Sequence, residues 1–223
     1  MATKKTEVIE IKPLDIKKVQ LRIVGDTPLI MHAWSIKEKR MMLEAQQGKK
    51  KGKEKPKKNP VNDFIQSMYW LDKMPDTEGM NEEECEKAFI EAINNGARFG
   101  FPVSGLKQAA ISAAYRLGWS KDKASLRGAF FIESDKNCMI EIKSDVPVIR
   151  EDMVRIGMGT ADIRYRGQFN NWYADITISY NANGQHDLAA IVNMLNAGGY
   201  VCGLGEWRVE KDGNFGMFHV EAI

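Results

Sequence analysis

Arginine and aromatic side chains alternate between residues 150 and 172, a pattern that can hold a nucleic-acid strand. Arginine pairs with phosphate groups, and both the flat guanidinium and an aromatic ring stack on bases. The segment therefore predicts a nucleic-acid-binding hairpin. The alternative is a hairpin whose aromatic rings pack on the core. The expected contact residues are Arg150, Arg155, Arg164, Arg166, Phe169 and Trp172.

Two further places have residue types that suit a phosphate. Ser104 and Lys107 stand at the start of an expected helix, where free backbone N–H groups and the helix dipole attract anions. Trp207 and Arg208 lie in a glycine-rich stretch, 203–216, where backbone without side chains can approach a ligand. The alternatives are an ordinary serine cap with a surface lysine, and a hairpin with turn glycines.

Charge is unevenly distributed along the chain, although the formal net charge is only +2. From residue 37 to 58 there are ten Lys or Arg and three Glu, which gives +7, and residues 76–86 have six acids and no base. The low-complexity part, about 48–60, predicts a mobile basic loop that either binds nucleic acid or is a solvated insertion. Its candidate contacts are Lys49, Lys50, Lys51, Lys53, Lys55, Lys57 and Lys58.

Catalytic signals are sparse. The chain has no phosphate-binding loop, no nucleophile elbow and no zinc-protease motif. His32 is a weak candidate for general acid–base chemistry, and its alternative role is structural. Cys85, Cys138 and Cys202 are too dispersed for a disulfide framework or a zinc site. We therefore expect no metal and no cofactor, and an enzyme is the less favoured class.

The hydrophobic pattern predicts an α+β protein in one domain, residues 1–223. Alternating residues at 19–24 and 173–180 indicate strands, and residues 104–118 and 187–195 indicate helices. Strands are also expected at 138–142, 200–202 and 217–220. No segment is apolar enough to cross a membrane, and the N-terminus lacks the apolar core of a signal peptide, so a cytoplasmic protein without membrane contact is expected.

In order, these elements form a ferredoxin-like βαββαβ core made of residues 17–31, 101–144 and 173–223. A long helical and basic insertion, 32–100, follows the first strand. A second insertion, 145–172, contains the arginine-rich hairpin. The outward face of the two best strands is polar, with no exposed aromatic pair, so loops and the hairpin are expected to bind the strand.

Three segments resemble the RAMP superfamily, the RNA-binding subunits of CRISPR effector complexes and their relatives. These are residues 101–109, the helix at 187–195, and Gly203–Gly205 with Gly213–Gly216. The glycine spacing is looser than in the tightest family form. The resemblance implies that 145–172 corresponds to the hairpin called the thumb in that family, and it fits a phage or mobile-element relative.

The leading hypothesis is a protein that coats or guides single-stranded RNA or DNA, as a homo-oligomer or as a ribonucleoprotein subunit. One alternative is a metal-independent endoribonuclease, since the resemblance implies a possible catalytic role for His32. Another is a protein-interaction module, such as a phage inhibitor of a host defence complex, in which the acidic stretch 76–86 binds a basic partner.

Overall fold

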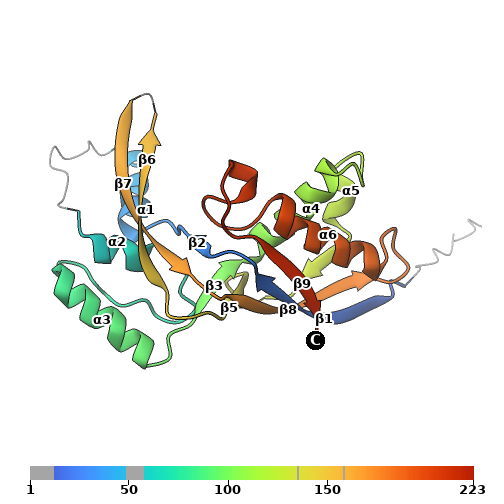
Figure 1. Ribbon diagram of the computed structural model, residues 1–223, viewed down its shortest axis with the longest axis horizontal. Helices are drawn as coiled ribbons and strands as arrows, with labels where there is room; N and C mark the ends of the chain where they lie inside the picture. The colour runs from blue at the N-terminus through green and yellow to red at the C-terminus, as the bar shows by residue number, and fades with distance from the viewer. Residues whose placement is uncertain (1–12, 49–57, 135, 158) are drawn as a thin grey trace, which may run out of the picture.

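Four antiparallel strands form the main sheet, in the order β4-β8-β1-β9. They are β1 (Ile16–Gly25), β4 (Phe130–Ile132), β8 (Tyr173–Asn181) and β9 (Phe218–Ala222). The computed structural model describes residues 13–48, 58–134, 136–157 and 159–223. Figure 1 shows this sheet edge-on at the lower right, beneath two helices.

Those helices, α4 (Val103–Arg116) and α6 (Leu188–Val201), cover one face of the sheet and pack against each other. Strand alternation sends Ile23 and Ile178 toward the helices, where both are fully buried. Each such side chain contributes roughly 1.5–3 kcal/mol by leaving water. The opposite face is polar, and Arg22 pairs there with Asp175 at 2.7 Å, Nε to Oδ1.

Two smaller sheets lie beside the main one. β2 (Leu29–Met31), β7 (Thr160–Phe169) and β6 (Val148–Ile156) pair in the order β2-β7-β6, and β3 (Phe99–Pro102) pairs with β5 (Met139–Ile142). β6 and β7 continue beyond β2 as a two-stranded hairpin that projects from the body (Figure 1). We call β6, β7 and their turn the hairpin.

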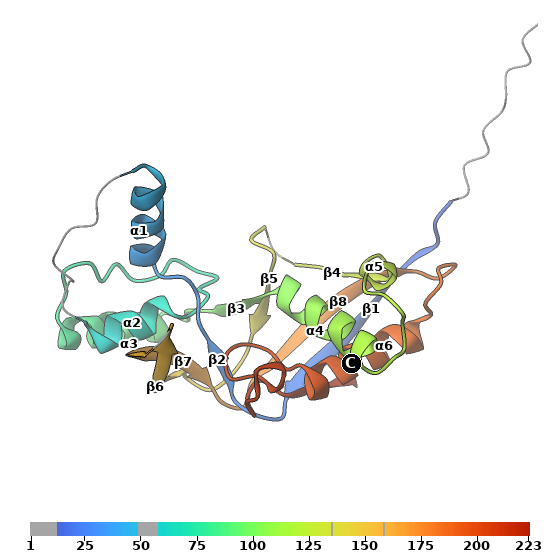
Figure 2. The same ribbon diagram turned by 90° about the horizontal axis from the view of Figure 1, so that it is seen from above.

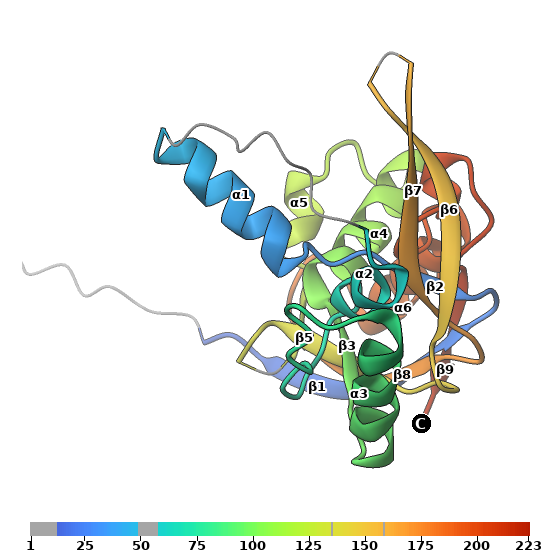
Figure 3. The ribbon, with the colours of Figure 1, turned by 90° about the vertical axis from the view of Figure 1, so that its left-hand side faces the viewer.

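The remaining helices lie mostly at the hairpin end of the molecule. These are α1 (Ile36–Gln46), α2 (Pro60–Gln66) and α3 (Glu82–Asn94). The short helix α5 (Ala124–Arg127) lies at the opposite end, and the 3-10 helix η1 (Val209–Lys211) lies in the glycine-rich stretch. α2 packs on β7, and α3 on α2. α1 stands away from the hairpin as a second projection (Figures 2 and 3). No helix among the described residues has the length and apolarity to span a bilayer.

Helix caps explain several of these boundaries. Ser35 and Asn81 each form a capping box, in which the cap side chain accepts from the N3 backbone N–H while a glutamate accepts from the cap. Asp187 caps α6 through the Ala190 N–H at 2.8 Å. Ser104 does not cap α4 as expected, because Pro102 is the N-cap residue and Ser104 already lies in the first turn.

The α+β class is confirmed, and three details of the predicted order are wrong. The strand at 138–142 exists as β5 but pairs with β3, so β4 takes the edge position beside β8. Residues 29–31 pair with β7 rather than joining the main sheet. Residues 200–202 end α6 instead of forming a strand, because the apolar face of that helix continues past 195. Each of these errors concerns which strand an element pairs with or where an element ends. Short apolar runs in a sequence specify neither of these.

The glycine-rich stretch 203–216, which we call the glycine loop, packs on its own chain. A Cβ atom on Gly205 would collide with the Ile30 carbonyl oxygen, and one on Gly216 with that of Leu204. Both residues also have positive φ, +74° and +66°. These glycines therefore allow close packing of backbone on backbone, which differs from the close approach to a ligand that the sequence suggested.

We expect Gly205→Ala to destabilise the protein by more than the roughly 1 kcal/mol that left-handed backbone alone costs a residue with a Cβ atom. Gly118→Ala is the matched control, because Gly118 has the same φ of +74° and no atom near its added Cβ. Thermal unfolding of the two variants measures the difference. Equal melting temperatures would contradict the packing explanation.

Candidate nucleic-acid interface

A groove with a volume of about 1110 Å³ separates the hairpin from the glycine loop. On the hairpin side it is lined by Arg155, Arg164 and Arg166, and on the loop side by Trp207, Arg208 and Lys211. The sequence placed the hairpin and loop candidates in two separate features. The fold brings these features face to face, and we call this space the hairpin groove.

The register of the hairpin places four of its charged residues on one face and puts Glu151 and Arg155 on the other. Arg150 pairs across the strands with Arg166, and Asp152 with Arg164. Because side chains alternate along a strand, all four project from the same side. Gly157 and Gly159 supply the positive φ angles of the turn between the strands, +64° and +93°.

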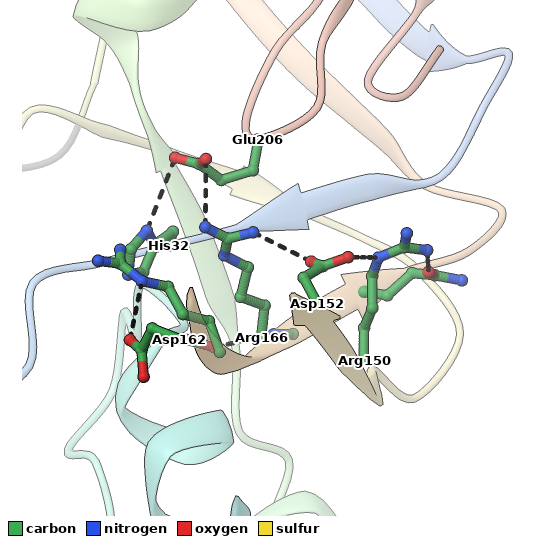
Figure 4. A network of polar contacts seen from close by, with 10 residues as sticks. His32, Arg150, Asp152, Asp162, Arg166 and Glu206 are labelled. Atoms are coloured by element: carbon green, nitrogen blue, oxygen red, sulfur yellow. Dashed lines mark hydrogen bonds and ion pairs between the residues drawn. The ribbon is translucent and has the colours of Figure 1, made fainter. Parts of the chain in front are cut away.

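Arg166 is the buried centre of a charge network that joins the hairpin to the glycine loop (Figure 4). Its side chain is 3% exposed, and Nη1 donates to Asp152 Oδ2 at 3.0 Å. Nη2 lies 3.4 Å from Glu206 Oε2, and Glu206 Oε1 lies 3.7 Å from His32 Nδ1. The contact with His32, and then the charge of Arg166, hold the pKa of Glu206 below its usual range against the opposing effect of burial.

Three other expected contact residues are already engaged within the protein. Arg150 donates to Asp152 Oδ1 at 2.9 Å and stacks over the Phe215 ring. Arg164 lies 3.4 Å from His32 Nε2. Arg208 Nη1 donates to the Gly205 carbonyl at 3.0 Å, and Nε donates to a glutamate oxygen in η1. Of the three, Arg164 and Arg208 line the groove, and their contacts leave them only partly free for a ligand.

Arg155 and Lys211 differ from these arginines in having no ion-pair partner in the part of the chain that the structure describes. Both are exposed, and both line the hairpin groove. Trp207, between them on the loop side, is 39% exposed and has a left-handed backbone (φ +52°). The Phe215 N–H donates to its carbonyl at 3.1 Å and helps to hold that conformation. The groove therefore combines unpaired cations with a partly exposed aromatic ring.

Phe169 and Trp172 do not contact a strand as expected. Phe169 is 0% exposed and Trp172 is 1% exposed, and both belong to the hydrophobic core. The Trp172 ring fills the space beside Gly25, and its Nε1 donates to the Thr27 carbonyl at 2.8 Å. The alternative interpretation, in which aromatics at the hairpin base pack on the core, is the correct one for these two rings.

Ser104 and Lys107 lie at the start of α4, and neither lines the hairpin groove. Ser104 is exposed in the first turn of α4. The Lys107 ammonium lies 4.4 Å from the centre of the Phe131 ring on β4, and burial lowers its pKa. The Lys107 ammonium is thus engaged by an aromatic ring, and the phosphate site at this helix start stays a prediction.

Of the basic loop, only Lys58 can be placed. Its ammonium pairs with Asp162 Oδ1 at 2.7 Å and also donates to the Ile163 carbonyl, so it is tied to β7. This contact is the main reason that the pKa of Asp162 is lowered. The other lysine candidates lie outside the described residues, namely Lys49, Lys50, Lys51, Lys53, Lys55 and Lys57.

A smaller pocket of about 190 Å³ adjoins the groove at the start of α4, and we call it the helix pocket. Its walls include the His32, Tyr69 and Phe101 rings, and it shares Glu206 and Arg208 with the hairpin groove. The Tyr69 and Phe101 rings meet edge to face with centroids 6.0 Å apart. His32 therefore has an acidic partner, which its isolated position in the sequence did not suggest.

Several residues of this region had no signal of their own in the sequence. Glu206 and Asp152 belong to no recognisable motif, and Lys211 is one surface lysine among many. The only sequence signal for a role of Glu206 and Lys211 was their position close to the candidate residues Trp207 and Arg208. The described residues contain no group of three or more His, Cys, Asp or Glu placed to hold a metal ion.

No protein-family model matches this chain, and no curated protein matches it either.

We expect Asp152→Ala to destabilise the protein by about 3 kcal/mol, because it leaves the buried Arg166 with one distant partner. Replacing both residues, Asp152→Leu with Arg166→Met, is expected to cost less than the single change, since no unpaired charge then remains buried. Chemical denaturation of Asp152→Leu, of Arg166→Met and of the double variant measures the coupling between the sites.

Asp72→Ala is the control for this cycle, because it removes the exposed pair with Arg98 and is expected to change stability little. If the double variant lost as much stability as the sum of the two single variants, the buried pair would not be a coupled unit.

Proposed function

We propose that this chain binds a single-stranded nucleic acid and that the strand lies in the hairpin groove. The observation that carries the proposal is the meeting of Arg155, Lys211 and Trp207 across one groove. Free cations pair with backbone phosphates, and an exposed ring stacks on bases. At about 1110 Å³ the groove exceeds the roughly 300–1,000 Å³ typical of small-molecule pockets, as a polymer site would.

A single strand suits the groove better than a duplex. Stacking on Trp207 requires a base whose faces are free, and a duplex hides those faces. On the outward face of the main sheet the Tyr173 ring is already engaged by the Arg22 guanidinium at 4.7 Å, and Arg22 also pairs with Asp175. The hairpin and the glycine loop, rather than the sheet, are therefore the proposed contact surfaces.

We extend the proposal to the fold family. The strand order β4-β8-β1-β9, with α4 and α6 on one face, supports a ferredoxin-like core. The projecting hairpin at 148–169 and the packed glycine loop are what a RAMP-type RNA-binding protein would have. In this interpretation the protein coats or guides a strand, as a homo-oligomer or as a subunit of a ribonucleoprotein.

We expect Arg155→Ala and Lys211→Ala each to weaken single-strand binding several-fold and to reduce the salt dependence, the slope of log K against log salt, by about 0.7. Trp207→Ala is expected to weaken binding by roughly 1–3 kcal/mol with the slope unchanged, since stacking releases no counterions. Fluorescence anisotropy with labelled single-stranded RNA, single-stranded DNA and duplex DNA at several salt concentrations measures both quantities.

Arg127→Ala and Lys121→Ala are the matched controls, because both residues are exposed and lie away from the groove. If the parent protein bound no strand at any salt concentration, the proposal would fail and a protein partner would become the leading function. If the control variants weakened binding as much as the groove variants, the groove would be the wrong site.

A second candidate function, metal-independent cleavage of RNA, has one observation in its favour. His32 lies between Glu206 and Arg164, at 3.7 Å and 3.4 Å, in the wall of the helix pocket. A carboxylate orients an imidazole for proton transfer, and an arginine can stabilise a developing negative charge.

If cleavage occurs, His32→Ala is expected to reduce its rate by about a hundred-fold or more while single-strand affinity changes little. Incubating RNA with the protein in the presence of a metal chelator, followed by denaturing electrophoresis, measures the rate. His186→Ala is the control, because His186 lies in a separate pocket beside Trp119. RNA that stays intact with the parent protein would remove this candidate.

A further inference from the structure

The helix pocket has a chemistry different from that of the hairpin groove. The groove is lined by five cations and one carboxylate, whereas the pocket is lined by two carboxylates, Glu206 and Glu210. Glu210 is paired with Arg116 at 2.7 Å and with Arg208 at 3.2 Å, so the charge of Arg208 is already balanced. Glu206 is likewise paired with Arg166, so the arginine that lines this pocket is engaged by a carboxylate and is not free for a phosphate.

The size and walls of the pocket suit a flat ring instead. Its volume of about 190 Å³ lies below the roughly 300–1,000 Å³ of typical small-molecule sites, which leaves room for one ring system without a sugar and phosphate. The Tyr69 and Phe101 rings supply apolar surface. Because the groove and the pocket share Glu206 and Arg208, a strand in the groove passes the pocket opening.

Two polar side chains in the pocket can distinguish bases. An ionised carboxylate such as Glu206 only accepts hydrogen bonds. The Gln108 amide can donate, and no residue in the described part of the chain forms a hydrogen bond with its side chain. The matching ligand has adjacent N–H donors for the carboxylate and a carbonyl acceptor for the amide.

Guanine has this pattern, with N1–H and the N2 amino group beside the O6 carbonyl. Adenine and cytosine place a bare ring nitrogen next to their amino group, and this nitrogen would face the carboxylate. Uracil has one N–H between two carbonyl oxygens, which a carboxylate repels. The acceptor and donor groups of the pocket therefore favour guanine over the other three bases.

We propose that the helix pocket takes one nucleobase from a strand held in the hairpin groove, and that Glu206 and Gln108 select guanine. The inference rests on the proposed function, because the groove must first hold the strand. In this proposal the groove binds the phosphates and the pocket binds one base. The groove residues then supply most of the affinity, and the pocket residues supply the base preference.

The test compares short oligouridylates that differ at one central position: uridine, guanosine, inosine or adenosine. A single guanosine avoids the association of guanine-rich strands. We expect the guanosine strand to bind about ten-fold more tightly than the all-uridine strand. The inosine strand is expected to fall between them, because inosine lacks the N2 amino group.

Gln108→Ala is expected to reduce the guanosine preference at least three-fold while salt-dependent binding of the all-uridine strand is retained. Glu206→Gln is expected to reduce the same ratio of guanosine to all-uridine affinity, whatever its effect on all-uridine binding, because Glu206 also lines the groove. Gln185→Ala and Glu86→Gln are the matched controls, both at exposed positions outside the pocket. If Glu206→Gln disturbs folding, as circular dichroism would show, the exposed helix position Gln108 still tests the inference.

Equal affinity for the guanosine and all-uridine strands, with salt-dependent binding intact, would overturn the base pocket and leave the proposed function standing. A guanosine preference that survives in Gln108→Ala and in a folded Glu206→Gln would also overturn it, by placing the selection elsewhere. Absence of binding to every strand would overturn the proposed function and the inference together.

Discussion

The contact on which the candidate interface depends is the buried guanidinium of Arg166. It joins Asp152 in the neighbouring strand of the hairpin to Glu206 in the glycine loop, two segments that are 40 and more residues apart in sequence. A guanidinium without partners at that depth would cost several kcal/mol, so both carboxylates have to be in place once the chain is folded. The hairpin is thereby fixed against the loop, and the groove between them has a defined width.

Because of this network, the cationic side chains of the region form two groups, those paired with carboxylates and those left unpaired. Arg166 and Arg208 line the groove and are paired with protein carboxylates, as is Arg150 beside them in the hairpin. Arg155 and Lys211 lie at exposed positions on opposite walls, where a phosphate backbone can reach them. Counting arginines along the sequence overestimates the charge available for binding, because a paired cation adds little attraction for a distant phosphate.

Several local features were predictable from the chain alone. The apolar face and Gly118 indicated α4, and alternation indicated β8 from residue 173 onward. Helix and strand periodicity arise from neighbouring residues, and a sequence displays them directly. The pairing of β5 with β3, rather than with the main sheet, was not predictable. Either pairing buries the same apolar face, and the choice depends on segments distant in the chain.

For the candidate site, the sequence by itself determined which residue types stand in the hairpin and in the glycine loop, and it indicated that both suit nucleic acid. Only the tertiary structure decided that they face each other, that Phe169 and Trp172 are core residues, and that His32 has Glu206 beside it. The physical reason is that burial and ion pairing are properties of the packed chain. An aromatic ring or an arginine has the same identity in the sequence whether a neighbouring segment covers it or leaves it open to solvent.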